Sequence, residues 1–307
     1  MVKTLTARRF AGALGLLSAA FLSGCQMTVL DPKGQIGADE KQLIITATVL
    51  MLLVVVPVIF LTLYFAWRYR ETNTQATYAP NWHHSTKIEV VIWAVPVLII
   101  VALATITWRT SHSLDPNERI AAAPGVKPIE VEVVALDWKW LFIYPEQHIA
   151  SVNEIAFPKD VPVHFKITSD SVMNAFFIPQ LGSQVYAMAG MQQNLNLVAN
   201  HEGVFDGMSA NFSGAGFSDM KFKAHVTSRE AFDQWVARVK ASPRQLNFDE
   251  YKQLSRPSEK VAVAYYSTVE PVLYMAVLDK YMDKATGIRL ADKLCLPGQQ
   301  KVAKASE

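Results

Sequence analysis

Two long apolar runs dominate the first third of the chain. The first covers residues 43–67 and holds no charged side chain, and the second covers residues 89–109 with charged residues only at its two ends. Each run is long enough to cross about 30 Å of hydrocarbon as an α-helix. Arg68 and Arg70 follow the aromatic end of the first run, as positive residues commonly do at a membrane boundary. The pattern therefore predicts a hairpin of two transmembrane helices.

The pattern changes to that of strands after the second run. From residue 129 apolar and polar residues alternate, and the alternation passes into an aromatic stretch that ends at residue 144. Further strands are expected at residues 154–157, 161–169, 175–178, 192–198, 204–212 and 222–227. Turn residues separate these segments. Short strands at such close spacing predict an all-β sandwich or barrel of the Greek-key type.

Helical patterns return after the last of these strands. Thr227 and Glu230 have the spacing of a capping box, which predicts the start of a helix. Its apolar stripe consists of Phe232, Trp235, Val236 and Val239. A second helix is expected to begin at Pro271, a residue type favoured in the first turn, and to run to Gly287. Both helices are expected to pack on the sandwich or on a neighbouring subunit, and the polar tail after them is expected to be poorly ordered.

The N-terminal residues carry the pattern of a cleaved export signal. Lys3, Arg8 and Arg9 form a positive start, and residues 10–22 form a short apolar stretch. The stretch ends in Leu-Ser-Gly-Cys, a bacterial lipoprotein cleavage box, so we expect the thiol of Cys25 to be lipidated. The alternative is an ordinary signal peptide that happens to contain a cysteine.

Lipidation would fix the topology of the hairpin. An exported Cys25 places the segment between the two runs in the cytoplasm, and everything from residue 110 onward in the periplasm. The modest positive charge of that segment agrees with the positive-inside rule. Glu89 then opens the second run at the cytoplasmic boundary. The helix dipole would stabilise its carboxylate there, although ionisable residues at a membrane edge also suggest a function.

Composition and charge exclude several classes of function. The net charge of +2 gives no support for binding to nucleic acid. With Cys25 lipidated, Cys295 is the only remaining cysteine, which leaves no pair for a disulfide. The sequence shows no nucleophile–base pair, phosphate loop, dinucleotide fingerprint or metal cluster, so no catalytic, cofactor-binding or metal-binding residue is assigned. Four histidines of the predicted exported domain show no ligand spacing, and they are His148, His164, His201 and His225. His83 and His84 lie in the polar loop between the runs.

A glycine-framed loop at residues 207–220 has the length of a loop that holds two copper ions. Such a dinuclear centre needs the pattern C-x-E-x-C-x-x-x-H-x-x-M, because bridging thiolates and imidazoles hold a soft, mixed-valence copper pair. The cysteine positions hold Ser209 and Ser213, the glutamate position holds Asn211, the histidine position holds Phe217, and only Met220 is retained. A thioether alone is a weak ligand. The loop is therefore expected not to bind copper.

A second segment lacks the same chemistry. A histidine would be needed before a Phe-x-Ile-Pro-like segment, but residues 174–179 read Asn-Ala-Phe-Phe-Ile-Pro, with Asn174 in its place. On these two segments the chain resembles subunit II of the haem-copper terminal oxidases, in the cytochrome bo-type branch that oxidises ubiquinol. The resemblance covers roughly residues 20–285. It implies a fold class of two transmembrane helices followed by an all-β cupredoxin-like sandwich with a C-terminal helical extension.

The resemblance also implies a function without catalysis in this chain. The chain would be a non-catalytic subunit II of a proton-pumping respiratory complex that oxidises ubiquinol and reduces O2 to water. The haems, the copper and the quinone site would belong to the large catalytic subunit I, and further small membrane subunits and membrane lipid would be partners. Glu89 would lie near the mouth of a proton channel. Trp138 and Trp140 lie where copper-bearing relatives place aromatic residues, but without copper they are expected to fill the core or an interface.

We expect four segments in a protein of the bacterial inner membrane. They are a signal peptide at residues 1–24, a lipid anchor and hairpin at 25–112, a periplasmic domain at 113–227, and a helical extension and tail at 228–307. Two alternatives stay open. One is a copper-binding electron-transfer protein, which would require the missing thiolates. The other is a membrane-anchored lipoprotein that uses its cupredoxin-like domain for binding or assembly.

Overall fold

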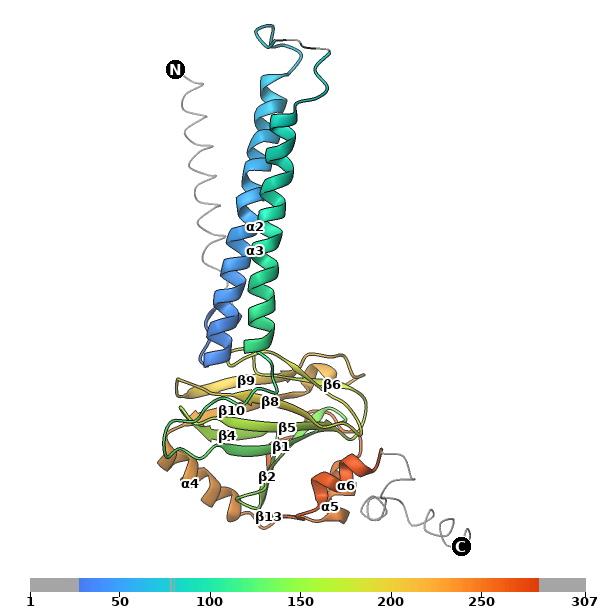
Figure 1. Ribbon diagram of the computed structural model, residues 1–307. Helices are drawn as coiled ribbons and strands as arrows, with labels where there is room; N and C mark the ends of the chain where they lie inside the picture. Colours follow the sequence, from blue (N-terminus) through green and yellow to red (C-terminus); the bar gives the residue numbers. More distant parts are fainter. Residues whose placement is uncertain (1–27, 78, 80, 282–307) are drawn as a thin grey trace, which may run out of the picture.

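The computed structural model describes residues 28–281 except residues 78 and 80. Figure 1 shows a long helical hairpin on one side of a β-sandwich, and short C-terminal helices on the opposite side. The expected signal peptide, Cys25, Cys295 and the end of the second C-terminal helix lie outside the described residues, so these expectations stay predictions.

The two apolar runs form the long helices α2 (Gln35–Arg68) and α3 (Thr86–Ser113). Within the described part of the chain, these are the two helices long and apolar enough to cross a membrane. Their apolar side chains face outward, and Trp93 for example is 71% exposed. Both helices extend beyond the predicted runs, because polar residues outside the hydrocarbon continue the same backbone hydrogen bonds. A short 3-10 helix, η1 (Thr28–Leu30), precedes α2.

Two β-sheets form the sandwich, and their strand orders are β12-β3-β2-β1-β5-β8 and β4-β10-β9-β6-β7. The first sheet consists of β1 (Ile129–Leu136), β2 (Lys139–Tyr144), β3 (Ile149–Val152), β5 (Val163–Ser169), β8 (Gln193–Leu197) and β12 (Ala264–Tyr266). The second consists of β4 (Glu154–Pro158), β6 (Asn174–Phe177), β7 (Val185–Ala187), β9 (Gly203–Ser209) and β10 (Lys221–Thr227). This arrangement confirms the predicted sandwich.

The strand pattern over residues 129–144 corresponds to two strands. The segment folds into β1 and β2, which pair antiparallel with Leu136 opposite Lys139. Asp137 and Trp138 form the turn between them, and Trp138 has a φ of 64°, in the left-handed region that bulky residues rarely adopt. No glycine or proline marks this turn in the sequence, so the residue types gave no sign of it.

Aromatic residues from both sheets fill the core between them. Trp140 from β2 is fully buried, and its ring centroid lies 5.4 Å from that of Phe176 on β6. Phe176 in turn stacks on Phe222 of β10, with the centroids 5.1 Å apart. Such rings bury large areas and pair with defined geometry, so they fix how the two sheets face each other. The prediction that Trp140 fills the core is confirmed.

The helix α4 (Arg229–Lys240) follows β10 and packs Phe232 and Trp235 against the sandwich. The prediction that Thr227 caps this helix is wrong, because Thr227 is the last residue of β10. Ser228 is the cap instead, and its Oγ accepts a hydrogen bond from the Ala231 N–H at 3.2 Å.

The remaining C-terminal elements cover the outer face of the six-stranded sheet. They are α5 (Phe248–Leu254), α6 (Leu273–Asp279) and the two-stranded sheet of β11 (Gln245–Leu246) and β13 (Thr268–Val269). Apolar residues from these elements and from β1, β2 and β3 form a second buried cluster. The helix α6 begins later than the predicted Pro271, because the Leu273 N–H first closes a turn with the Glu270 carbonyl at 3.0 Å.

Candidate functional site

The two segments that the sequence singled out meet at one end of the five-stranded sheet. Asn174 is the first residue of β6 and Ser209 is the last residue of β9. These strands pair antiparallel, with Phe176 opposite Ser209. The β5–β6 loop (residues 170–173) and the β9–β10 loop (residues 210–220) therefore leave the sheet side by side, near the label of β6 in Figure 1.

Asn174 and Ser209 form a buried polar pair. The Ser209 hydroxyl donates to Asn174 Oδ1 at 3.1 Å, and the Ala175 N–H donates to the Ser209 hydroxyl at 3.4 Å. The Asn174 side-chain amide donates to the Val172 carbonyl at 3.0 Å. The two residues are only 1% and 4% exposed, and these hydrogen bonds pair the polar atoms of both side chains.

Asn211 and Ser213 continue the contact between the two loops and Trp138. The Asn211 side-chain amide donates to the Met173 carbonyl at 3.0 Å, so each loop holds the other. The Trp138 indole N–H donates to the Ser213 carbonyl at 3.1 Å. A Cβ built on Gly216 would lie 2.6 Å from the Trp138 ring, so the loop needs glycine there to lie directly on the indole. Trp138 thus supports the β9–β10 loop, and its own unusual turn positions it.

Phe217 and Met220 have apolar surroundings. Phe217 lies in the short 3-10 helix η2 (Phe217–Asp219) and packs edge-on against Phe212, with the centroids 5.6 Å apart. Phe212 is 76% exposed. Met220 is buried in the core, and its backbone carbonyl accepts a hydrogen bond from the Ser209 N–H at 3.1 Å. The thioether of Met220 therefore belongs to the core of the sandwich.

The donors at this end of the sheet do not fit a dinuclear copper centre. They are hydroxyl, amide and thioether groups, whereas a soft copper pair is held by thiolates and imidazoles. Two histidines of the sandwich have other partners, since His164 contacts the side chain of Asn196 and His225 lies 3.4 Å from a carboxylate oxygen of Glu154. No group of three potential metal ligands among His, Cys, Asp and Glu occurs in residues 28–281 outside the two omitted positions.

Glu89 lies in the first turn of α3, at the far end of the hairpin from the sandwich. Its carboxylate is 2.7 Å from His84 Nδ1, and both side chains are about half exposed. The sequence placed His84 in a solvated loop and did not anticipate this contact. The two side chains meet at the helix start, where the positive end of the dipole favours the carboxylate.

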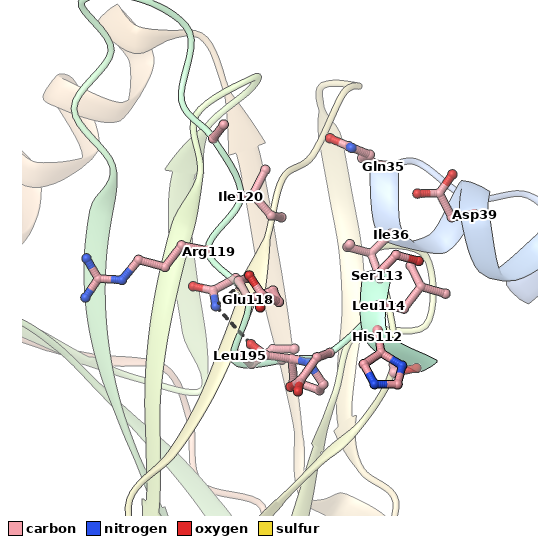
Figure 2. A pocket seen from close by; sticks show the side chains of 15 residues that line it. Gln35, Ile36, Asp39, His112, Ser113, Leu114, Glu118, Arg119, Ile120 and Leu195 are labelled. Atoms are coloured by element: carbon pink, nitrogen blue, oxygen red, sulfur yellow. Dashed lines mark hydrogen bonds between the residues drawn. The ribbon is translucent and has the colours of Figure 1, made fainter. Parts of the chain in front are cut away.

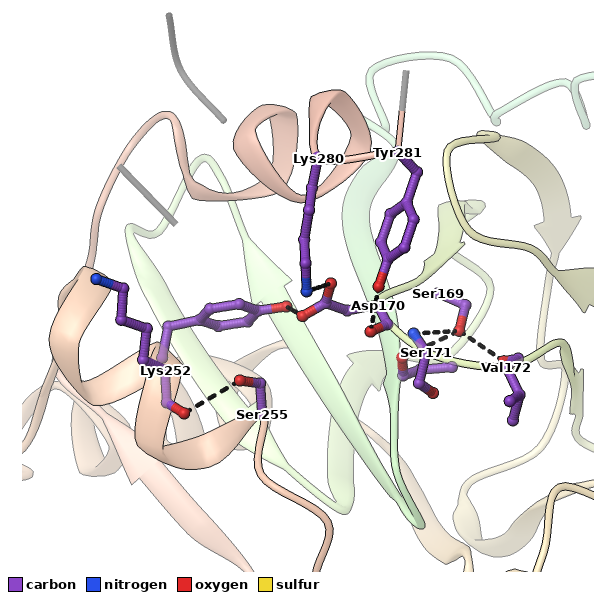
Figure 3. Close-up of polar contacts among 10 residues, drawn as sticks. Ser169, Asp170, Ser171, Val172, Lys252, Ser255, Lys280 and Tyr281 are labelled. Atoms are coloured by element: carbon purple, nitrogen blue, oxygen red, sulfur yellow. Dashed lines mark hydrogen bonds and ion pairs between the residues drawn. The ribbon is translucent and has the colours of Figure 1, made fainter. Parts of the chain in front are cut away.

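A buried carboxylate beside the site was missed by sequence reasoning. Asp170 begins the β5–β6 loop, and its side chain is 1% exposed. It accepts hydrogen bonds from Lys280 Nζ at 2.7 Å and from the Tyr251 hydroxyl at 2.8 Å, while the Tyr281 hydroxyl donates to its backbone carbonyl at 2.8 Å. Figure 3 shows Lys280 and Tyr281 reaching Asp170 from the C-terminal segment. We call these four residues the Asp170 cluster. Its members are far apart in the sequence and follow no shared motif.

A cavity of about 310 Å³ lies where the hairpin meets the sandwich (Figure 2). Its lining includes Asp39 from α2, His112 from α3 and Glu118 from the loop that follows. Backbone hydrogen bonds fix this junction, among them one from the Gly37 N–H to the Leu181 carbonyl at 3.0 Å. Figure 2 shows Arg119 extending away from the helix ends, so the charges around the cavity do not converge on one point.

Comparison with known proteins agrees with this geometry. Two family models match the chain: "Cytochrome C oxidase subunit II, periplasmic domain" over residues 129–227 and "COX Aromatic Rich Motif" over residues 240–285. Cytochrome bo(3) ubiquinol oxidase subunit 2 of Pseudomonas aeruginosa is 60% identical over 268 residues, which is 87% of this chain and 80% of that protein. The protein of the same name from Pseudomonas putida is 57% identical over 273 residues, 89% of this chain and 86% of that protein.

A solved structure shows a weaker likeness to this chain. It is the periplasmic domain of subunit II of cytochrome oxidase from Bradyrhizobium japonicum, which is 21% identical and has a TM-score of 0.34. The match covers 36% of this chain and 91% of that structure.

Proposed function

Because the chain belongs to the subunit 2 family of the ubiquinol oxidases, we propose that it is a non-catalytic subunit of a proton-pumping complex. The complex oxidises ubiquinol in the membrane and reduces O2 to water. The observation that carries this proposal is the hydrogen bond between Ser209 and Asn174, which places a buried polar pair where a copper electron-entry site would need a thiolate and an imidazole. We infer that this electron-entry site has been lost.

The loss has a physical reason. A soluble electron donor such as cytochrome c arrives from the periplasm and needs a relay on that side of the membrane. Ubiquinol is dissolved in the bilayer and delivers electrons from within it, so a periplasmic copper relay is unnecessary. The haems, the copper and the quinone site would then belong to the large catalytic subunit, beside which α2 and α3 pack laterally while the sandwich caps its periplasmic face.

The proposed topology follows from the expected lipid anchor. Residues 1–24 would be removed as a signal peptide, and residues 25–112 would form the lipid anchor at Cys25 and the hairpin. Residues 113–227 would form the periplasmic domain, followed by the extension and tail at 228–307. The whole would lie in the bacterial inner membrane, with Glu89 on the cytoplasmic side near the mouth of a proton channel of the large subunit.

Co-purification tests this function. The full chain, carrying an affinity tag and produced together with the large subunit of the same oxidase, should retain a haem-bearing partner through purification. The purified complex should consume O2 with ubiquinol as donor and should show no near-infrared band of a mixed-valence copper pair. Purification of the chain alone, or oxidation of reduced cytochrome c together with such a band, would contradict the proposal.

A further inference from the structure

The Asp170 cluster joins two parts of the chain that the strand ladders do not join. Asp170 directly follows β5 and lies four residues before Asn174. The hydrogen-bond donors that reach it from the cluster come from α5 and from the end of α6, which lie 81 to 111 residues further along the chain. The C-terminal segment thus holds the start of a loop whose other end belongs to the candidate site.

Electrostatics make this contact specific. Burial alone would lower the pKa of the Lys280 ammonium, but its hydrogen bond and attraction to Asp170 outweigh burial and raise that pKa. Burial, and next the charge of Asp170, raise the pKa of the Tyr251 hydroxyl well above its usual range, so this hydroxyl stays a donor. A buried carboxylate needs such partners, because an unpaired charge in the interior is very costly.

Hydrogen bonds run from Ser169, the residue before Asp170, along the loop to the site. Ser169 Oγ accepts from the Ser171 N–H at 3.2 Å and donates to the Val172 carbonyl at 2.8 Å. The Val172 carbonyl also accepts the bond from Asn174, as described above. Every residue between Asp170 and Asn174 therefore takes part, because the Met173 carbonyl accepts from Asn211 of the opposite loop.

Tyr281 also reaches a third loop. Gly190, in the connection between β7 and β8, has a φ of 71°, and a Cβ built there would lie 2.9 Å from the Tyr281 Cβ. The tyrosine therefore packs against the backbone of this connection while its hydroxyl bonds to Asp170. The tip of the β5–β6 loop itself, at Val172 and Met173, is exposed and has no such packing.

We propose that the Asp170 cluster is a conformational clamp, by which the C-terminal segment sets the conformation of residues 170–174 and, through them, the Asn174–Ser209 contact. The side chains of the β5–β6 and β9–β10 loops do not fit a copper centre. Contacts within the protein therefore have to link these two loops. The clamp supplies an anchor on the outer side, and the hydrogen bonds of Asn211 and Ser209 supply the cross-link.

Hydrogen exchange on the full chain in detergent or nanodiscs tests the clamp. Lys280→Met removes the cation and keeps most of the side-chain volume, while Lys223→Met removes the cation of an exposed ion pair with Asp206 and serves as the matched control. In Lys280→Met, amides of residues 170–175 and 211–214 should exchange about tenfold faster or more, since a charged hydrogen bond at a buried group is lost. Amides of β1 and β10 should keep their protection, and the control should match the unaltered chain.

Three outcomes are decisive. Faster exchange at residues 170–175 and 211–214 with an unchanged core supports the clamp. Faster exchange confined to the C-terminal segment would overturn it, because the segment would then hold only itself. Equal acceleration of the core strands would also overturn it, because the cluster would then be part of the global fold. Should Lys280→Met not fold, Tyr251→Phe and Tyr281→Phe each remove a single hydroxyl and are read by the same criteria.

Discussion

Ser209 donates a hydrogen bond to Asn174 across two segments that are 35 residues apart in the sequence, at a distance of 3.1 Å. Both side chains are buried, and each lies at the end of a strand that a loop continues. The pair therefore does at this end of the sheet what a shared metal would do, which is to hold two loops together. Its hydroxyl and amide groups are neutral and, unlike a copper pair, cannot accept and pass on an electron.

Removing the Ser209 hydroxyl should destabilise the sandwich. Ser209→Ala leaves Asn174 Oδ1 without its donor and the Ala175 N–H without its acceptor, both in a buried place. We expect a loss of about 1–3 kcal/mol in the free energy of unfolding, the usual cost of an unsatisfied buried polar group. Denaturant unfolding of the chain in detergent measures it. Ser218→Ala, at an exposed position of the same loop, is the control, and equal stability of the two variants would contradict the prediction.

The contact between Gly216 and Trp138 should not tolerate a methyl group. In Gly216→Ala the new Cβ would lie 2.6 Å from the indole, so either the loop or the ring must move. Overpacking of this kind costs about 1–3 kcal/mol, which should appear as a lower unfolding midpoint. Gly216→Ala should cost less stability in a Trp138→Ala background than in the unaltered chain, because the ring that the methyl group meets is then absent. If the two changes simply add, the close contact is not the cause.

Glu132 should make stability depend on pH. It lies on the outer face of β1, and burial raises its pKa from 4.5 to about 7, with Lys166 opposing the shift and Glu130 adding to it. The folded chain then binds this proton more tightly than the unfolded chain. The contribution of Glu132 to the free energy of unfolding should therefore fall as pH rises from about 4.5 to about 7 and stay level above.

The variant Glu132→Gln isolates this effect. It should lose stability less steeply than the unaltered chain across the same pH interval, so the difference between the two should grow in favour of the variant as pH rises. Glu146→Gln, at an exposed residue paired with Lys127, should follow the unaltered chain. Parallel curves for Glu132→Gln and the unaltered chain would show that Glu132 titrates normally.

Glu89 should matter for proton uptake if the chain forms the proposed complex. Its carboxylate lies at the start of α3 beside His84, where a negative charge can attract protons to a channel mouth. Glu89→Gln should lower the turnover of the reconstituted complex by up to about tenfold, the low end of the gains that charged clefts give to cation capture. The haem content should stay unchanged. Turnover equal to that of the unaltered complex would contradict a role in proton uptake. Glu89 would then only stabilise the start of the helix.

Some features of the fold could be predicted because they repeat locally. The apolar runs of α2 and α3 and the alternation of β1 are such patterns, and both elements form where they were expected. The turn at Trp138 could not be predicted, because tertiary packing against Gly214 and Gly216 holds a conformation that the residue itself disfavours. Threonine and serine are both common at helix N-caps, so the sequence could not distinguish Thr227 from Ser228. Ser228 is the cap because Thr227 is still part of β10.

Some features of the candidate site could likewise be predicted from the sequence, and others could not. The positions of Asn174 and Ser209 followed from motif spacing, but the hydrogen bond between them depends on the pairing of β6 and β9. The Asp170 cluster could not be found from spacing at all, since Lys280 lies 110 residues after Asp170. Contacts of this kind depend on how the C-terminal segment folds back over the sheet, and no local pattern encodes that path.

The most direct test restores the missing ligands. A variant with Asn174→His, Ser209→Cys, Asn211→Glu, Ser213→Cys and Phe217→His keeps Met220 and completes the pattern of a dinuclear copper centre. A control with the same changes except Ser209→Cys lacks one bridging thiolate. After copper loading, near-infrared absorption and electron paramagnetic resonance should show a mixed-valence copper pair in the full variant and none in the control. A folded full variant that binds no copper, or only isolated copper ions, would contradict the account that these loops are the scaffold of a lost copper site.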